Sequence, residues 1–107
     1  MTTAERIKSA GFNEAKKIVR DKLLTDPAWL VRGLLAIYAR QTADEQRAEA
    51  TELHNKVGFN GADANILTGF AKQWQTREWF SDKQMGMLRR LMPKYSAQLV
   101  RLARGVC

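Results

Sequence analysis

The 107-residue sequence predicts an all-α fold: a compact bundle of about six helices in a single domain, residues 1–107. Helix start signals recur along the chain, and apolar residues repeat with the helical period of 3.6. The alternation typical of strands is missing from the sequence, as are internal repeats. Hydrophobic residues make up 45% of the chain, which is enough to form a core.

The N-terminal quarter predicts two helices. Thr2 and Glu5 have the spacing of a capping box, so a short helix is expected to run to about Ala10 and to end at Gly11. Asn13 is expected to cap a second helix with a narrow apolar face. The solvent-facing side of that helix is predicted to carry Lys16, Lys17, Arg20 and Lys22.

The next two helices differ in polarity. Asp26 followed by Pro27 is a strong helix start, and the helix to about Arg40 is apolar nearly all round, which predicts the most buried helix of the bundle. A second capping box, Thr42 to Glu45, predicts a separate surface helix over about 43–55.

Residues 57–61 predict a loop. Gly58 and Gly61 permit positive φ, and at least one of them is expected to adopt it. Phe59 is expected to anchor the loop in the core. Asp63 then begins or caps a helix that runs to about Thr76. The core is predicted to contain Trp29, Leu34, Leu35, Phe70, Trp74, Leu88 and Leu99.

The C-terminal helix, Asp82 to Arg104, is the amphipathic element around which the sequence is organised. A third capping box, Ser81 with Gln84, opens it, and Pro93 predicts a kink or a short break. At 100° per residue its basic side chains fall nearly on one line, opposite an apolar stripe. We call this row the basic ridge: Lys83, Arg90, Lys94 and Arg101.

The charge of the chain is concentrated in the same region. The net charge is +7, and residues 72–107 contain eight basic and two acidic residues. A localised basic surface is typical of proteins that bind polyanions. The alternative is a solvated helix face without a ligand.

Catalytic and metal-binding groups are few. His54 is the only histidine and Cys107 the only cysteine, so neither a histidine metal cluster nor a Cys–His pair is expected. Glu45, Glu49 and Glu52 share a helix face that could hold a cation with Asp63, although a solvated face is the simpler interpretation. We expect no catalytic residue, no cofactor and no metal. The sequence also predicts a cytoplasmic protein without membrane association, because it has no long apolar run and cannot form an internal disulfide.

Aromatic residues precede the basic helix. Trp79 and Phe80 cannot both be buried easily in a short connection, so at least one is expected at the surface, where it could stack on a base. The helices 63–76 and 81–92 also have a helix-turn-helix outline, in which Lys83, Gln84, Met87 and Arg90 would face a groove of DNA. Helix pairs of this length are equally common in bundles that bind no DNA.

Several short motifs in the second half of the chain occur together. They are a GFNG-x-DA run from Gly58 to Ala64, a Lys83–Gln84 pair, and K-Y-x-x-Q-L from Lys94 to Leu99. This pattern resembles small helical modules encoded by phages and mobile elements, which are associated with replication and recombination regions. The resemblance implies a role in nucleic-acid metabolism and supplies no catalytic residues. The same residues could instead specify the fold.

The sequence therefore predicts a non-enzymatic nucleic-acid-binding accessory protein of phage-type replication or recombination. The residues expected to contact nucleic acid, single-stranded or duplex, are Lys83, Arg89, Arg90, Lys94, Arg101 and Trp79. The alternative is a protein–protein adaptor or inhibitor that docks its basic ridge on an acidic partner surface. A homodimer is also left open, because a domain this small buries a modest share of its surface.

Overall fold

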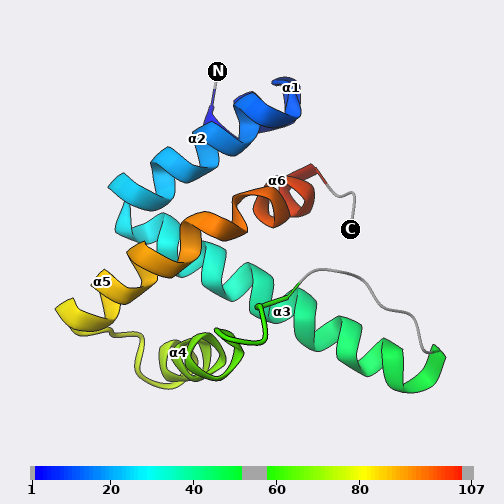
Figure 1. The fold of residues 1–107 in the computed structure, drawn as a ribbon, viewed down its shortest axis with the longest axis vertical. Coiled ribbons are helices and arrows are strands. Elements are labelled where there is room, and N and C mark those ends of the chain that lie inside the picture. Colours follow the sequence, from blue (N-terminus) through cyan, green and yellow to red (C-terminus); the bar gives the residue numbers. More distant parts are fainter. Residues whose placement is uncertain (1, 52–57, 105–107) are drawn as a thin grey trace.

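The computed structural model describes residues 2–51 and 58–104, with side chains described outside 44–51. These residues contain helices and no strands, which confirms the all-α class (Figure 1). The elements are α1 (Thr3–Ser9), α2 (Phe12–Thr25), α3 (Pro27–Thr51), α4 (Ala64–Arg77), α5 (Asp82–Leu91), the 3-10 turn η1 (Met92–Tyr95) and α6 (Ser96–Arg104). If α5, η1 and α6 are counted as one kinked helix, the described residues hold five helices rather than the six expected.

The start of α1 follows the prediction, whereas the start of α2 does not. Thr2 Oγ1 accepts a hydrogen bond from the Glu5 N–H at 3.2 Å. The N-cap of α2 is Gly11, in an extended conformation without a side-chain cap, so Asn13 lies inside the first turn. The prediction that Asn13 caps this helix is therefore wrong. Glycine is itself an acceptable N-cap residue. Because the helix already begins at Phe12, Asn13 is its second residue, and its side chain is exposed on the helix surface.

The helix that begins at Pro27 is longer than predicted. Asp26 caps it, and its Oδ1 accepts from the Ala28 N–H at 3.0 Å. No break occurs at Thr42, so the expected separate helix over 43–55 is instead the second half of α3 as far as Thr51. Thr42 Oγ1 donates to the Tyr38 carbonyl at 2.9 Å, a bond that a threonine forms within a helix rather than at its start. Residues 52–57 lie outside the described part of the chain.

The core is formed where α2, α3, α5 and α6 meet. Leu34, Leu88 and Leu99 are buried as predicted. Trp29, Leu35, Phe70 and Trp74 are partly buried and pack against this core, so the prediction that they are largely buried holds only in part. The fully buried set includes Leu23, Leu30, Leu34, Ile37, Leu67, Leu88, Met92 and Tyr95. Trp29 and Leu35 of α3 therefore lie at the edge of the core rather than at its centre.

Pro93 bends the C-terminal helix as predicted. The Met92 N–H still donates to the Leu88 carbonyl, and Met92 is the first of the four residues of the 3-10 turn η1. A proline cannot donate to the turn before it, which is why the α-helical ladder ends here. Beyond η1 the chain takes a new direction as α6, which packs on α1, α2 and α3, whereas α5 packs on α3 (Figure 1).

The N- and C-terminal ends of the described chain are held together by one arginine. Arg104 on α6 donates through Nε and Nη2 to the Ile7 carbonyl at 3.1 and 3.0 Å, and Nη2 also donates to the Ala10 carbonyl. These carbonyls belong to the last turn of α1, where the helix itself supplies no donor. Arg104 therefore joins α6 to the end of α1, and its guanidinium is not free to bind a ligand.

Replacing Leu34 by alanine tests the orientation of α3. Leu34 is fully buried, so its truncation removes apolar contacts and leaves a cavity. We expect the free energy of unfolding to fall by about 2–5 kcal/mol, measured by urea denaturation followed by circular dichroism. The exposed Ala36 is the control site: Ala36→Ser should change stability by less than about 0.5 kcal/mol. A Leu34→Ala effect as small as the control would contradict this orientation.

Candidate functional site

The basic ridge is divided by the bend at Pro93. Lys83, Arg89 and Arg90 are exposed on α5, as predicted. Lys94 lies on η1 and Arg101 on α6, beyond the bend and next to α2. The structure therefore places the predicted cations in two groups, three on α5 and two beside α2.

Lys94 has a fixed partner. Its Nζ lies 2.6 Å from Oδ2 of Asp63, whose side chain is 9% exposed, against 44% for Lys94. The hydroxyl of Tyr95 donates to the same oxygen at 2.7 Å. These two donors hold the pKa of Asp63 below its ordinary value, with the Lys94 bond the largest cause, and burial only partly opposes them. Lys94 is therefore a half-exposed cation whose position is set by a buried carboxylate.

Arg101 is held against an aromatic ring. The ring of Phe12, at the start of α2, lies 5.5 Å from the guanidinium carbon of Arg101 and 5.3 Å from Nζ of Lys16. The ring centroid is also 6.0 Å from Arg104. Cations within about 6 Å of a ring face are attracted to it. Phe12 thus gathers cations from α2 and α6 at one place on the surface.

A groove runs from this place between α2 and the η1–α6 segment. It has a volume of about 510 Å³ and is lined by Asn13, Lys16, Lys17, Arg20, Pro93, Lys94, Ser96 and Ala97. We call it the basic groove. Four of its lining residues are cationic and none is acidic, and only Lys94 has an ion-pair partner among the described residues. Such a concave, positively charged surface concentrates anions from solution.

The helical period of α2 explains why its cations line this groove. Ala15, Val19 and Leu23 form the buried stripe of α2. Asn13, Lys17 and Arg20 are spaced i, i+4 and i+7, so they share another face of the helix. The sequence predicts only that these cations face solvent and assigns them no role. The spacing of these residues indicates a shared polar face. The first 71 residues, however, contain nearly equal numbers of basic and acidic residues, so their net charge does not point to a basic surface.

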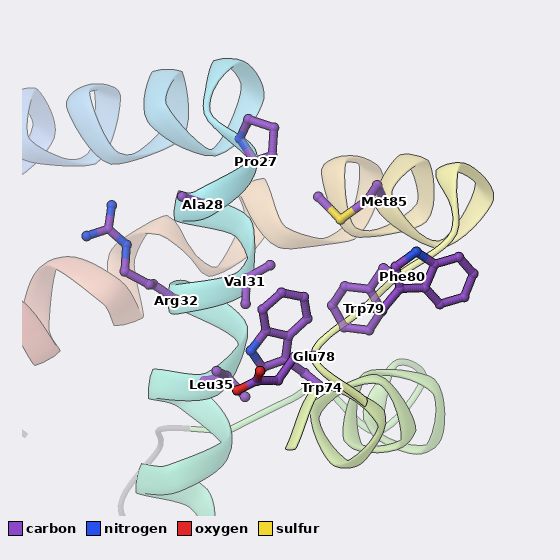
Figure 2. A pocket seen from close by; sticks show the side chains of 10 residues that line it. All are labelled: Pro27, Ala28, Val31, Arg32, Leu35, Trp74, Glu78, Trp79, Phe80 and Met85. Atoms are coloured by element: carbon purple, nitrogen blue, oxygen red, sulfur yellow. The ribbon is translucent and has the colours of Figure 1, made fainter. Parts of the chain in front are cut away.

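Trp79 does not line the basic groove. The prediction that Trp79 or Phe80 reaches the surface is confirmed, because Trp79 is 58% exposed and Phe80 is buried against Phe70 and Trp74. Trp79 borders a second, apolar groove between α3 and the 78–80 connection (Figure 2). None of the residues that line this groove also lines the basic groove.

The α4–α5 pair does not present Gln84 as a helix-turn-helix reader would. Gln84 forms the predicted capping box with Ser81, accepting from the Ser81 N–H at 2.9 Å while Ser81 Oγ accepts from the Gln84 N–H at 3.2 Å. The Gln84 amide also exchanges two hydrogen bonds with the Gln73 amide, at 2.8 and 3.0 Å. Gln84 is therefore occupied in joining the two helices.

The GFNG-x-DA and K-Y-x-x-Q-L motifs form one structural network. The amide of Gln98 accepts from the Gly58 N–H at 2.9 Å and donates to the Gly58 carbonyl at 3.0 Å. The Tyr95 hydroxyl accepts from the Asn60 N–H at 3.0 Å while it donates to Asp63. The Phe59 ring packs edge-on against Tyr95, which confirms its predicted role as an anchor. These motifs therefore position residues 58–63 against the C-terminal segment.

Burial and its bond to Asp63 raise the pKa of Tyr95 to about 12. Ionisation of the phenol would place a second negative charge beside the Asp63 carboxylate in a buried site. Tyr95 therefore stays protonated and acts as a donor across the physiological range.

The loop glycines differ from the prediction. Neither Gly58 nor Gly61 has a φ in the left-handed range, so the expected positive φ is wrong. A Cβ at Gly58 would instead come within 2.9 Å of Gln41 Oε1, the atom that accepts from the Phe59 N–H at 2.8 Å. At position 58 a larger residue would therefore displace the end of the Gln41 side chain, whereas the backbone conformation does not call for glycine.

Other predicted features fall partly outside the described residues. His54 and Glu52 lie there, and the side chains of Glu45 and Glu49 are not described either. Among the residues whose side chains are described, 2–43 and 58–104, no group of three or more His, Cys, Asp or Glu residues could hold a metal ion. Within the same part of the chain, no helix is both long and apolar enough to cross a membrane.

Comparison with protein-family models, curated proteins and solved structures found no match to the chain. The resemblance to phage-encoded modules therefore stays a prediction. The chemistry of the described surface is the basis on which a function can be proposed.

Alanine substitutions at the two loop glycines should have different effects. Gly58→Ala would displace the Gln41 amide and weaken its bond to Phe59, so we expect a decrease of about 1 kcal/mol in the free energy of unfolding. A Cβ at Gly61 meets nothing within 4 Å, so Gly61→Ala should be neutral or slightly stabilising. Urea denaturation of both variants makes the comparison. Equal effects at the two positions would contradict the role given to Gln41.

The Asp63–Tyr95 bond should make stability depend on pH at both extremes. The stabilisation from Asp63 is present above its ordinary pKa of 3.8 and is lost as the pH falls through its lower folded value. The stabilisation from Tyr95 is intact below pH 10.0 and is lost as the pH rises towards about 12. We therefore expect the parent protein to lose its stability advantage over Asp63→Asn in acid and over Tyr95→Phe in alkali.

Urea denaturation over a pH series measures both differences. Subtracting the variant from the parent removes the contributions to stability that the parent and Tyr95→Phe share. A stability difference that stays constant between pH 10.0 and about 12 would contradict the role given to Tyr95.

Proposed function

We propose that the chain is a non-enzymatic nucleic-acid-binding protein whose contact surface is centred on the basic groove. The observation that carries this proposal is the convergence of Lys16, Lys17 and Arg20 from α2 with Lys94 from η1 around one concave surface without acidic lining. Nucleic acid is the common partner that presents closely spaced negative charges to such a row of cations.

The arrangement suits a phosphate backbone in two respects. Lys17 and Arg20 are exposed and keep flexible side chains, which can follow successive phosphates. Lys94 is fixed in place by Asp63, and Arg101 by Phe12, so part of the surface is organised before a ligand arrives. Organising cations in advance lowers the entropic cost of binding.

The cations of α5 extend this surface in the proposal. Lys83, Arg89 and Arg90 are exposed but line no part of the basic groove. They would add electrostatic attraction at longer range, which is screened beyond about 10 Å at 0.1 M salt. The groove residues are accordingly expected to contribute more to affinity than the α5 residues do.

Two charge-reversed variants test the proposal. Lys17→Glu with Arg20→Glu alters the basic groove, and Lys83→Glu with Arg90→Glu alters α5 by the same total charge. All four side chains are exposed, so both variants should fold and melt like the parent. We expect the groove variant to bind labelled single- and double-stranded DNA and RNA at least about tenfold more weakly, and the α5 variant to be weakened less.

Fluorescence titrations at two salt concentrations provide the measurement. The groove variant should also show a shallower salt dependence, by about 0.7 to 0.9 units of log–log slope for each phosphate that it no longer binds. A greater weakening in the α5 variant would place the contact surface on α5. Absence of binding by the parent protein at low salt would reject nucleic acid as the partner and favour an acidic protein surface.

A further inference from the structure

An apolar groove remains on α3 that the proposed nucleic-acid contact does not use. It has a volume of about 550 Å³ and is lined by Pro27, Ala28, Val31, Arg32, Leu35, Trp74, Glu78, Trp79, Phe80 and Met85. We call it the α3 groove. In Figure 2 the indole of Trp74 lies between α3 and the 78–80 connection, and the guanidinium of Arg32 extends away from these aromatic side chains.

The α3 groove belongs to a wider apolar surface. A smaller groove of about 370 Å³ lies beside it, lined by Trp29, Gly33, Leu99 and Leu102 among others, and Arg32 lines both. The strip of α3 that bears Arg32 also carries the small exposed residues Ala28 and Ala36. Small residues on an exposed helix let another chain approach closely. Exposed apolar surface of this kind marks a contact site for another protein.

Glu78 at the edge of the α3 groove is held at a cost in energy. It has φ 52° and ψ 38°, the left-handed conformation that ends α4, where glycine is the usual residue. No ion pair joins its carboxylate to a described residue, and the same holds for Arg32. The N–H of Glu78 donates to the Trp74 carbonyl at 2.9 Å, so the helix end explains this conformation, and the carboxylate without an ion pair is the group left for a partner.

The surface around the α3 groove is self-complementary, because it carries both members of the pairs that a two-fold symmetric contact would form. In a two-fold symmetric contact, each residue pair occurs twice, because residue i of one copy meets residue j of the other and the reverse. The edge of the α3 groove carries one cation, Arg32, whose guanidinium carbon lies 5.5 Å from the Trp29 ring, and one anion, Glu78; neither is in an ion pair with a described residue. It also offers a projecting side chain, Trp79, next to a cavity large enough to receive an aromatic ring.

We infer that the α3 groove is a homodimer interface, in which Arg32 of each copy pairs with Glu78 of the other and Trp79 is buried in the contact. A polyanion does not suit this surface, because its lining is mainly apolar and its two charges cancel. A second copy of the same chain supplies both charges and the aromatic side chain at once.

A charge exchange distinguishes a symmetric contact from a general apolar surface. Arg32→Glu alone places two pairs of like charges in the contact, and Glu78→Arg alone does the same. The double variant restores both pairs with reversed signs. We expect sedimentation equilibrium to show a dimer for the parent, at least a tenfold higher dissociation constant for each single variant, and recovery of most of the affinity in the double variant.

Trp79→Ser and Leu24→Ser form a matched pair. Trp79 lines the α3 groove, whereas Leu24 is a comparably exposed apolar residue on α2, with 42% exposure, that does not line it. Trp79→Ser should weaken dimerisation and Leu24→Ser should leave it unchanged. Circular dichroism confirms that each variant is folded.

Two outcomes would overturn the inference. One is a parent protein that stays monomeric up to about 1 mM, a concentration at which even a weak self-association is populated. The other is a dimer whose affinity is insensitive to Arg32, Glu78 and Trp79, which would place the contact elsewhere.

Discussion

The buried carboxylate of Asp63 is the group on which the arrangement of the second half of the molecule depends. It accepts from the Tyr95 hydroxyl at 2.7 Å and pairs with Lys94 at 2.6 Å, and Tyr95 in turn accepts from the Asn60 N–H. A buried charge is tolerated only when it is paired and hydrogen-bonded. Asp63 thus requires both partners, and satisfying it fixes residues 58–63, the turn η1 and the side chain of Lys94 together.

The 3-10 turn at Pro93 is the second constraint. It gives Lys94 and Tyr95, adjacent in sequence, a common partner in Asp63 and redirects the chain so that α6 packs on α1 and α2. Two consequences follow for the surface. Arg101 is brought to Phe12, and Arg104 reaches the carbonyls at the end of α1. A straight continuation of α5 would have kept the predicted row of cations intact and left the basic groove without its second wall.

The two proposed surfaces act through different forces. In the proposed function the basic groove acts through charge, which reaches several ångströms into solution and weakens with salt. In the proposed dimer the α3 groove acts mainly through apolar contact, which has short range, with one ion pair in each direction to set the register. Since no residue lines both, self-association would leave the basic groove open. A dimer would then present two basic grooves to one nucleic-acid strand and gain affinity by linkage.

By itself, the sequence determined the fold class, most helix starts, the bend at Pro93, the buried Leu34, Leu88 and Leu99, and the surface position of Trp79. These follow from local chemistry, namely caps, proline geometry and apolar period. Only the tertiary structure decided that α3 continues through Thr42, that Gly58 lies against Gln41, and that a groove is lined by Lys94 together with Asn13, Lys16, Lys17 and Arg20 of α2. The physical reason is that each of these depends on the residues that pack against a segment, and a helical period gives the direction of a side chain without giving its neighbour.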